Sequence, residues 1–467
     1  MAFSSVIFIF AFLPLSLLCY NLLGRNNNIT TKNVLLLILS LIFYAWCGIG
    51  YLALLMVLLV VNYWFSTHVS GNKKWLVMGI TVDLIVLAFF KYLNFCVDSV
   101  AAIVSMLTGQ EAVFTVARIP LPLGISFIAF QVISFLADRY HNKIEEQPTF
   151  VEFALYITMF PQLIQGPIVR YSQVGTALKE RTVQREDLHA GVQRFILGLA
   201  KKVFLANTVA PVANQAFSSV QLPIGFAWLG IICYAMEIYF DFSGYSDMAI
   251  GLCRMFGFHI LENFNFPYLA TSIQDFWRRW HISLSSWFRD YVYIPLGGNR
   301  NGVAKTYRNL IIVFFLTGLW HGANWTFICW GLFHGAFMLL ERVGFGRVLK
   351  KLPIVVQRLY SLVVVLIGWV FFRANDVAQA GRYIASMFFP MTNNYADISM
   401  MQLLDGEFVI LLVISILVAL KIPQQVYGRF ADRIPQPVKD AVLVLLFLVS
   451  LAFVAGSDFS PSIYEKF

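Results

Sequence analysis

Long apolar segments recur from one end of this chain to the other. Its 467 residues are 59% hydrophobic and 13% charged, with a mean hydropathy of +0.72. Soluble domains carry roughly a quarter charged residues. In lipid, every backbone amide must be paired within the protein, which a helix achieves by itself. The sequence therefore predicts an all-α, polytopic integral membrane protein.

Apolar length sets the expected number of helices. A span needs about 20 mainly apolar residues, and several segments here are shorter, so we expect about eleven spans plus short re-entrant or interfacial helices. Residues 75–95 and, more weakly, 100–107 are two separate candidates. We expect a single domain over residues 1–467, with no part able to fold alone in water. The first segment, residues 4–23, lacks the basic start and cleavage site of a signal peptide, so we expect it to be retained.

Charge placement gives an orientation. The net charge is +9, and Lys and Arg of membrane proteins collect in cytoplasmic loops, so the excess does not indicate nucleic-acid binding. Arg25 and Lys32 follow the first apolar segment, which predicts an N-terminus outside. The basic loop 421–439 is predicted to be cytoplasmic, leaving the tail 457–467 outside. The six cysteines form no C-x-x-C pair, and no zinc or P-loop motif occurs, so we expect no metal site.

Residues 275–281 crowd basic and aromatic side chains into one short segment. Arg278 and Arg279 carry forked donors that suit phosphate, and Trp280 could cover an adenine or an acyl chain. His281 follows directly. The alternative is an interfacial belt, where Trp and Arg are common anyway. The pattern alone leaves both interpretations open.

His321 lies in the apolar region 309–340, where His334 is the only other side chain that titrates near neutral pH. An imidazole at membrane depth is costly unless it is paired or lines a wet cavity. It would suit the removal of a proton from an attacking hydroxyl. The alternative is a packing histidine. In an unbroken helix His334 would lie about 220° away from His321, which favours packing for His334.

The neighbours of His321 fit a site. Trp320 precedes it, and Asn324 could donate to a developing oxyanion. We expect Gly318, Gly322 and Gly331 to leave walls thin enough for a passage, so that Gly322→Leu would block activity while sparing folding.

Glu237 and Asp241 are unexpected acids in an apolar run, and their i,i+4 spacing places them on one helix face. Two buried carboxylates must share a proton or meet a cation. The arginines between residues 275 and 289 are candidate partners in a structural ion pair. Alternatively, one carboxylate orients a catalytic imidazole.

Two further segments combine proline and glycine at membrane depth, residues 120–127 and 160–167. Broken helices of this kind line cavities in membrane proteins. A helix start is the other interpretation, because proline is tolerated in the first turn.

Several of these motifs together resemble the membrane-bound O-acyltransferase (MBOAT) superfamily, and within it the membrane subunits that O-acetylate alginate and related polysaccharides. They lie in the core at about 120–340. The matching segments are residues 160–167 (FPQLIQGP), 241–247 (DFSGYSD), 275–284 (DFWRRWHISL), 288–298 (FRDYVYIPLGG) and 318–325 (GLWHGANW).

The resemblance implies a helix bundle around a central tunnel in a bacterial inner membrane. It implies that His321 is the essential histidine and His281 the supporting one. The donor would be cytoplasmic acetyl-CoA, with no permanently bound cofactor. The acceptor would be an extracytoplasmic polysaccharide such as alginate, reached directly or through a periplasmic partner of the SGNH-hydrolase type.

Two alternatives remain at this stage. A related branch of the superfamily transfers D-alanine from a carrier protein to teichoic acid. A polysaccharide or lipid-linked sugar transporter would use His321 as a proton relay, but transporters of this type are built from internal repeats, and none is evident here.

Overall fold

The computed structural model describes residues 1–467 except 24–27, 112–113, 115–117, 220–221, 391–399 and 457–467. Arg25 and the tail 457–467, on which part of the predicted orientation rests, lie outside the described residues. The described part is helical and contains no β-strand, which confirms the all-α class. Its helices, with 3-10 and π segments labelled η, are η1 (Phe8–Phe12), α1 (Leu13–Leu23), α2 (Ile29–Ala45), α3 (Ile49–His68), α4 (Lys73–Thr108), α5 (Ile125–Tyr140), α6 (Phe150–Thr158), α7 (Phe160–Leu163), α8 (Tyr171–Lys179), α9 (Arg185–Ala200), η3 (Lys201–Ala206), α10 (Asn207–Ser218), α11 (Ile224–Met255), η4 (Pro267–Leu269), α12 (Ile273–Arg279), α13 (Ile282–Phe288), η5 (Arg289–Tyr293), α14 (Val303–His321), α15 (Trp325–Leu340), η6 (Glu341–Phe345), α16 (Gly346–Leu349), α17 (Ile354–Arg373), α18 (Val377–Phe388), α20 (Gly406–Ala419), α21 (Ile422–Phe430), η7 (Ala431–Arg433) and α22 (Gln436–Gly456).

Six of the described helices are long and apolar enough to cross a membrane: α3, α4, α9 continued through α10, α11, α17 and α22. A seventh results if α20 and α21–η7, which meet at 71°, count as one bent span. Two shorter apolar helices cover Phe8–Leu22 and Ile29–Ala45. These helices do not confirm the predicted count of about eleven. The two segments predicted at 75–95 and 100–107 are one helix, α4, of 36 residues.

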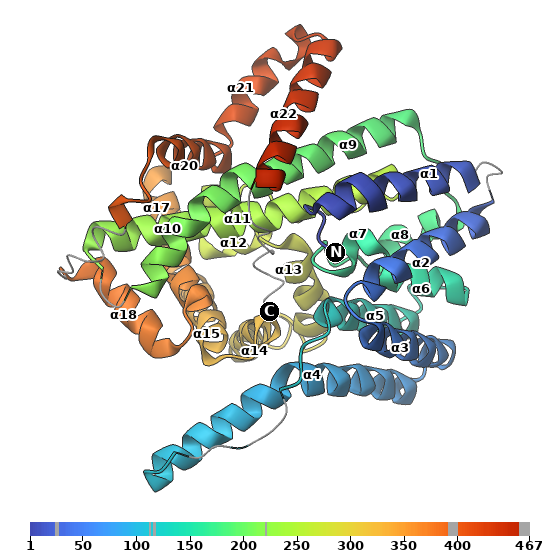
Figure 1. Ribbon diagram of the computed structural model, residues 1–467. Helices are drawn as coiled ribbons and strands as arrows, with labels where there is room; N and C mark the ends of the chain where they lie inside the picture. The colour runs from blue at the N-terminus through green and yellow to red at the C-terminus, as the bar shows by residue number, and fades with distance from the viewer. Residues whose placement is uncertain (24–27, 112–113, 115–117, 220–221, 391–399, 457–467) are drawn as a thin grey trace.

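Helices α9 and α11 run side by side through the middle of the bundle (Figure 1). Their contact is made by glycines seven residues apart on each helix. A Cβ on Gly198 would lie 2.5 Å from the carbonyl oxygen of Gly244, and one on Gly191 would lie 2.7 Å from that of Gly251. Small residues let membrane helices approach backbone to backbone, which replaces the hydrophobic driving force that lipid does not supply.

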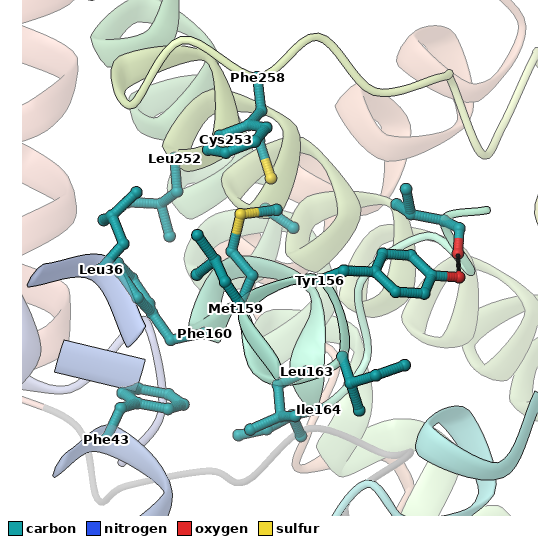
Figure 2. Packing of buried hydrophobic residues seen from close by; sticks show 14 of the residues in the cluster. Leu36, Phe43, Tyr156, Met159, Phe160, Leu163, Ile164, Leu252, Cys253 and Phe258 are labelled. Carbon is teal, nitrogen blue, oxygen red and sulfur yellow. Dashed lines mark hydrogen bonds between the residues drawn. The ribbon is translucent and has the colours of Figure 1, made fainter. Parts of the chain in front are cut away.

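The two segments rich in proline and glycine pack on each other. Gly124 adopts φ +75°, and a Cβ there would lie 2.6 Å from the carbonyl oxygen of Leu163. The break between α6 and α7 is buried in the core, where Tyr156, Phe160 and Leu163 lie among apolar side chains (Figure 2). The side-chain amide of Gln162 donates to the carbonyl of Tyr156 at 2.7 Å. The predicted helix break therefore exists, and side chains fill the space around it.

Helices α14 and α15 form a tight hairpin whose glycines differ from the prediction. A Cβ on Gly331 would lie 3.2 Å from the Cα of Gly318, and one on Gly318 would clash with the carbonyl of Phe327. A Cβ on Gly322 would clash with the Phe327 ring. These glycines close the hairpin, so they do not leave a passage. The expectation that Gly322→Leu spares folding is wrong, because the added side chain would enter the Phe327 ring.

The α9–α11 contact yields a stability prediction. Gly244→Ala places a methyl 2.7 Å from the carbonyl oxygen of Gly198, and overpacking of this kind costs about 1–3 kcal/mol. Gly225→Ala in the same helix is the matched control, because nothing lies within 4 Å of its Cβ and replacing helical glycine with alanine is favourable by roughly 0.5–1 kcal/mol.

Thermal unfolding of the detergent-solubilised protein should therefore shift down for Gly244→Ala and stay level or rise for Gly225→Ala. Equal midpoints for the two variants would contradict the backbone contact.

Candidate active site

The short helix α12 carries the basic and aromatic residues singled out above, and its N-terminus is fixed by two acceptors. The Ser272 hydroxyl accepts from the backbone N–H of Asp275 at 3.0 Å. The Glu341 carboxylate accepts from the backbone N–H of Ile273 at 2.6 Å and of Gln274 at 3.1 Å. Burial raises the pKa of Glu341 above its usual value, although these two donors oppose the shift. The end of α15 thereby holds the start of α12.

The two arginines of α12 have different surroundings. Arg279 forms an ion pair with Asp275, one turn earlier, at 2.9 Å, and also donates to the carbonyl of Asn265 at 3.4 Å. Arg278 is exposed, and no ion pair ties it to the part of the chain that the structure describes. Arg278 is therefore the better placed of the two to meet a ligand.

Trp280 is 1% exposed and packs inside the bundle. Its ring lies 4.8 Å from that of Trp369 and 5.7 Å from that of Phe276, measured between centroids. Trp280 therefore supports the site by packing against these rings, and in this arrangement it does not face a ligand. The role of a cover over adenine remains a prediction.

His281 is fully buried between α12 and α13 and has a left-handed backbone, with φ +44°. Residues other than glycine rarely adopt this conformation, and it concentrates at functional sites. Nδ1 lies 3.2 Å from Oδ1 of Asn263. That same oxygen accepts from the backbone N–H of Ser283 at 3.2 Å and from its hydroxyl at 2.9 Å.

These contacts favour one tautomer of His281. A backbone N–H can only donate, so the Asn263 atom facing Ser283 must be the acceptor oxygen. A proton on His281 Nδ1 pairs with this oxygen at 3.2 Å, which is closer than the 3.4 Å between Nδ1 and the Ser283 hydroxyl. Nε2 is left with a lone pair, and it has no hydrogen-bond partner among the described residues. An imidazole in this state can accept a proton.

His321 is the last residue of α14 and is 3% exposed. Its ring is surrounded by those of Trp320, Trp330 and Phe372, with centroids 5.0, 4.9 and 5.1 Å away. The centroid of the His281 ring lies 6.1 Å from that of the Trp320 ring. The structure therefore brings the two predicted histidines to the same tryptophan from segments 40 positions apart in the sequence.

His334 lies closer to this group than predicted. The chain breaks after His321 and α15 starts at Trp325, so the expected placement on opposite faces of one helix is wrong. The His334 ring lies 5.3 Å from that of Trp330 and 5.2 Å from that of Trp277. It is fully buried among aromatic rings, in accord with the predicted packing role.

Asn324 begins α15. Its side-chain oxygen accepts from the backbone N–H of Thr326 at 3.1 Å, and its amide donates to the carbonyl of Asn375 at 2.7 Å. Both functional ends of the amide thus hold the start of α15. Its predicted part in an oxyanion site would rely on the second amide hydrogen.

One of the two acids of α11 meets a basic residue outside the predicted segment. Asp241 is 1% exposed and forms an ion pair with Lys202 of η3, whereas the prediction named the arginines between 275 and 289. The basic residue comes instead from the neighbouring helix. Glu237, one turn earlier, is half-buried. No group of three His, Cys, Asp or Glu that could hold a metal occurs in the described ranges.

The sequence reasoning missed three residues that hold the histidines. Asn263 lies 3.2 Å from Nδ1 of His281, and the Ser283 hydroxyl lies 3.4 Å from the same nitrogen. Lys91 of α4 donates to the backbone carbonyls of Trp320 and, at 3.5 Å, of His321. A lone lysine inside the apolar segment 75–95 was a visible signal for Lys91. Nothing in the sequence pattern links Asn263 to His281.

Two cavities approach the histidines from different elements. One of 920 Å³ is bounded by α9, α11 and α20–α22 and reaches Asn263, Ser246 and Ile282 beside His281. Another of 430 Å³ lies between the second half of α4 and the start of α15, and reaches Lys91, Ala323 and Asn324 beside His321.

Comparison with known proteins shows the family of this chain. The chain is 39% identical to a probable alginate O-acetylase of Azotobacter vinelandii over the whole of both chains. It is 44% identical to one of Pseudomonas aeruginosa, covering 83% of this chain and 75% of the relative. Identity to a peptidoglycan O-acetyltransferase of Helicobacter pylori is 36%, with 82% and 79% covered. The model of the membrane-bound O-acyltransferase family matches residues 10–374, and the chain belongs to this family.

Proposed function

We propose that this acyltransferase carries an acetyl group across a bacterial inner membrane and transfers it, from cytoplasmic acetyl-CoA, toward an extracytoplasmic polysaccharide such as alginate. The observation that carries the proposal is the meeting of His281 and His321 at Trp320, with one cavity reaching residues beside each histidine. The names of these relatives support the acetyl group and the polysaccharide.

The orientation follows from where the basic loops gather. Contacts tie several of them together at one end of the bundle. Arg181 donates to Tyr20 and Asn33, Lys179 pairs with Glu146, and Arg254 pairs with Asp187. By the charge rule this end faces the cytoplasm, which puts the N-terminus outside. With the shorter helices included, we propose about eleven crossings around a central tunnel.

The 920 Å³ cavity is the proposed donor entrance. Arg194 lies on its wall and forms ion pairs with Asp247 at 2.6 Å and Glu262 at 2.5 Å. Apolar residues of α20 and α22, such as Leu411 and Leu446, line another part of it. A wall with a polar end and an apolar end suits the phosphates and the pantetheine arm of acetyl-CoA, whose thioester would then point toward His281.

The 430 Å³ cavity is the proposed acceptor entrance. An ion pair between Arg118 and Asp98, at 2.7 Å, lies on its wall, and Asn94 and Asn324 add amide groups. These groups suit a hydroxyl-rich acceptor, either the polysaccharide itself or the serine of a periplasmic SGNH-type partner.

The chemistry then runs at the two histidines. The His321 imidazole takes the proton of the acceptor hydroxyl as its oxygen attacks the thioester carbonyl. The carbon–sulfur bond breaks, and the leaving thiolate takes the same proton from the His321 imidazolium. The lone pair on His281 Nε2 accepts a hydrogen bond during this exchange, and Asn263 keeps that nitrogen unprotonated before reaction. General base catalysis of this kind contributes about 10²–10⁴-fold.

His321→Ala should therefore lower acetyl transfer by at least about 10²-fold while the protein still accumulates in the membrane. The exposed His141 provides the matched control, and His141→Ala should keep wild-type activity. The measurement is the acetyl content of the exported polysaccharide in cells that lack the native enzyme. Full acetylation by well-expressed His321→Ala would refute the base assignment. D-alanyl esters on the product would favour D-alanyl transfer, and export of unmodified polymer would favour a transporter.

The two arginines of α12 should respond differently. Arg278→Ala should raise the KM for acetyl-CoA several-fold with little change in thermal stability, because Arg278 is exposed and outside the ion pairs above. Arg279→Ala should lower stability, as should Asp275→Ala, because each breaks the same 2.9 Å pair. An unchanged donor KM in Arg278→Ala would remove it from the donor site.

Two variants of Asn263 test the tautomer of His281. Asn263→Leu should lower kcat by at least tenfold, because Nδ1 of His281 and Ser283 lose their shared acceptor. Asn263→Asp keeps an oxygen in place and should retain much more activity. The two variants can be compared by initial rates in membrane vesicles, normalised to protein amount. Equal rates for both would show that the hydrogen bond to Nδ1 does not matter.

A further inference from the structure

Lys91 is a buried cation on a helix that otherwise faces outward. The buried positions of α4 are Gly79, Asp83, Leu87 and Lys91, spaced four residues apart along one stripe. Lys91 is 8% exposed, and it forms no ion pair with an acid in the described part of the chain. An ammonium inside a membrane span needs compensation, and residues of this kind are retained for function.

Its compensation comes from the end of α14. The Nζ atom donates to the carbonyl oxygens of Trp320 and, at 3.5 Å, of His321. It also donates to the Ser126 hydroxyl of α5 at 3.3 Å. The next residue, Tyr92, donates from its hydroxyl to the carbonyl of Leu319 at 2.6 Å. Three successive carbonyls of α14 are thus held by two successive side chains of α4.

These carbonyls are the ones a helix cannot satisfy itself. The last four C=O groups of a helix have no partner within it, and its C-terminus carries a partial negative charge that a cation stabilises. After His321 the backbone turns into the extended Gly322, with φ −169°. Without Lys91 the last turn of α14 would lose the direct contacts to α4, and through Lys91 to α5, that define its position.

We propose that Lys91 is a positioning residue for the acyl transfer: it fixes the final turn of α14 and thereby aims the imidazole of His321 between the two cavities. This rests on the proposed role of His321 as base. Lys91 also lies on the wall of the 430 Å³ cavity, so its ammonium separates the acceptor entrance from the end of α14. Its hydrogen bonds go to the protein, and it does not react itself.

The role predicts a loss in the chemical step. Misplacing a catalytic group by about 1 Å can lower the rate about 10²-fold. Lys91→Met, which keeps the unbranched apolar stem of the side chain and removes the donors, should therefore lower kcat about 10²-fold and leave the KM for acetyl-CoA within about twofold. Lys91→Arg keeps the donors and should retain more activity than Lys91→Met. Tyr92→Phe removes one of the donors and should cause a smaller fall.

The experiment measures kcat and KM in membrane vesicles for these variants, with Lys74→Met as the matched control. Lys74 is exposed near the start of the same helix, so its replacement should leave both constants unchanged. Wild-type kcat in Lys91→Met, with His321→Ala inactive, would overturn the positioning role alone. Activity in His321→Ala would overturn the proposed function itself.

Chemical rescue covers the case in which Lys91→Met fails to accumulate. Lys91→Ala leaves space at the wall of the open cavity, and ethylammonium added to the vesicles can enter there and donate to the same carbonyls. Partial recovery of kcat, absent with ethanol, supports the role. No recovery in a folded variant, together with wild-type kcat in Tyr92→Phe, would contradict it.

Discussion

At membrane depth the ammonium of Lys202 lies against the carboxylate of Asp241, and both side chains are buried. Isolated, either charge would cost several kcal/mol in such surroundings, and neither could be satisfied by lipid. The same constraint accounts for two further polar contacts of the interior. Asn62 donates to Asp83 at 2.8 Å, and Lys91 donates to the end of α14. Each pair joins different helices, so satisfying polar groups also fixes how the bundle is assembled.

Glycine contacts complete this assembly. Lipid does not drive apolar faces together, so close backbone approach supplies the packing. Gly198 and Gly244 join α9 to α11, and Gly318 and Gly331 join α14 to α15. The second contact places the break after His321 at a fixed depth, with Trp330 of the returning helix against the His321 ring. The position of the histidine thus follows from the packing of the hairpin and from the cation at its end.

Much of this could be predicted from local sequence. Apolar length predicts helices, and the crowding of Trp, Arg and His at 275–281 indicates either a ligand site or an interfacial belt. Glycine was misjudged, since its small size permits either a ligand or another backbone to approach, and only the fold decides between them. Contacts between distant positions were also out of reach. Lys91 and Trp320 are 229 residues apart, and Asn263 shows no periodicity that would reveal its partner.

The helix count illustrates another limit. The expected number of membrane crossings was derived from the lengths of the apolar segments. However, α20 and α21 meet at 71°. Helix α4, at 36 residues, is longer than the roughly 20 residues that a bilayer requires. Bends between helices and helices longer than the bilayer arise from tertiary packing, which a local count of apolar residues cannot predict.

The central claim is that donor and acceptor reach one pair of histidines from opposite entrances. An experimental structure with a non-hydrolysable analogue of acetyl-CoA tests it most directly. The account predicts that the analogue lies in the 920 Å³ cavity, with its acyl end beside His281 and His321 and its phosphates toward the basic end of the bundle. An analogue bound at the Arg118–Asp98 side, or with its acyl end remote from both imidazoles, would contradict it.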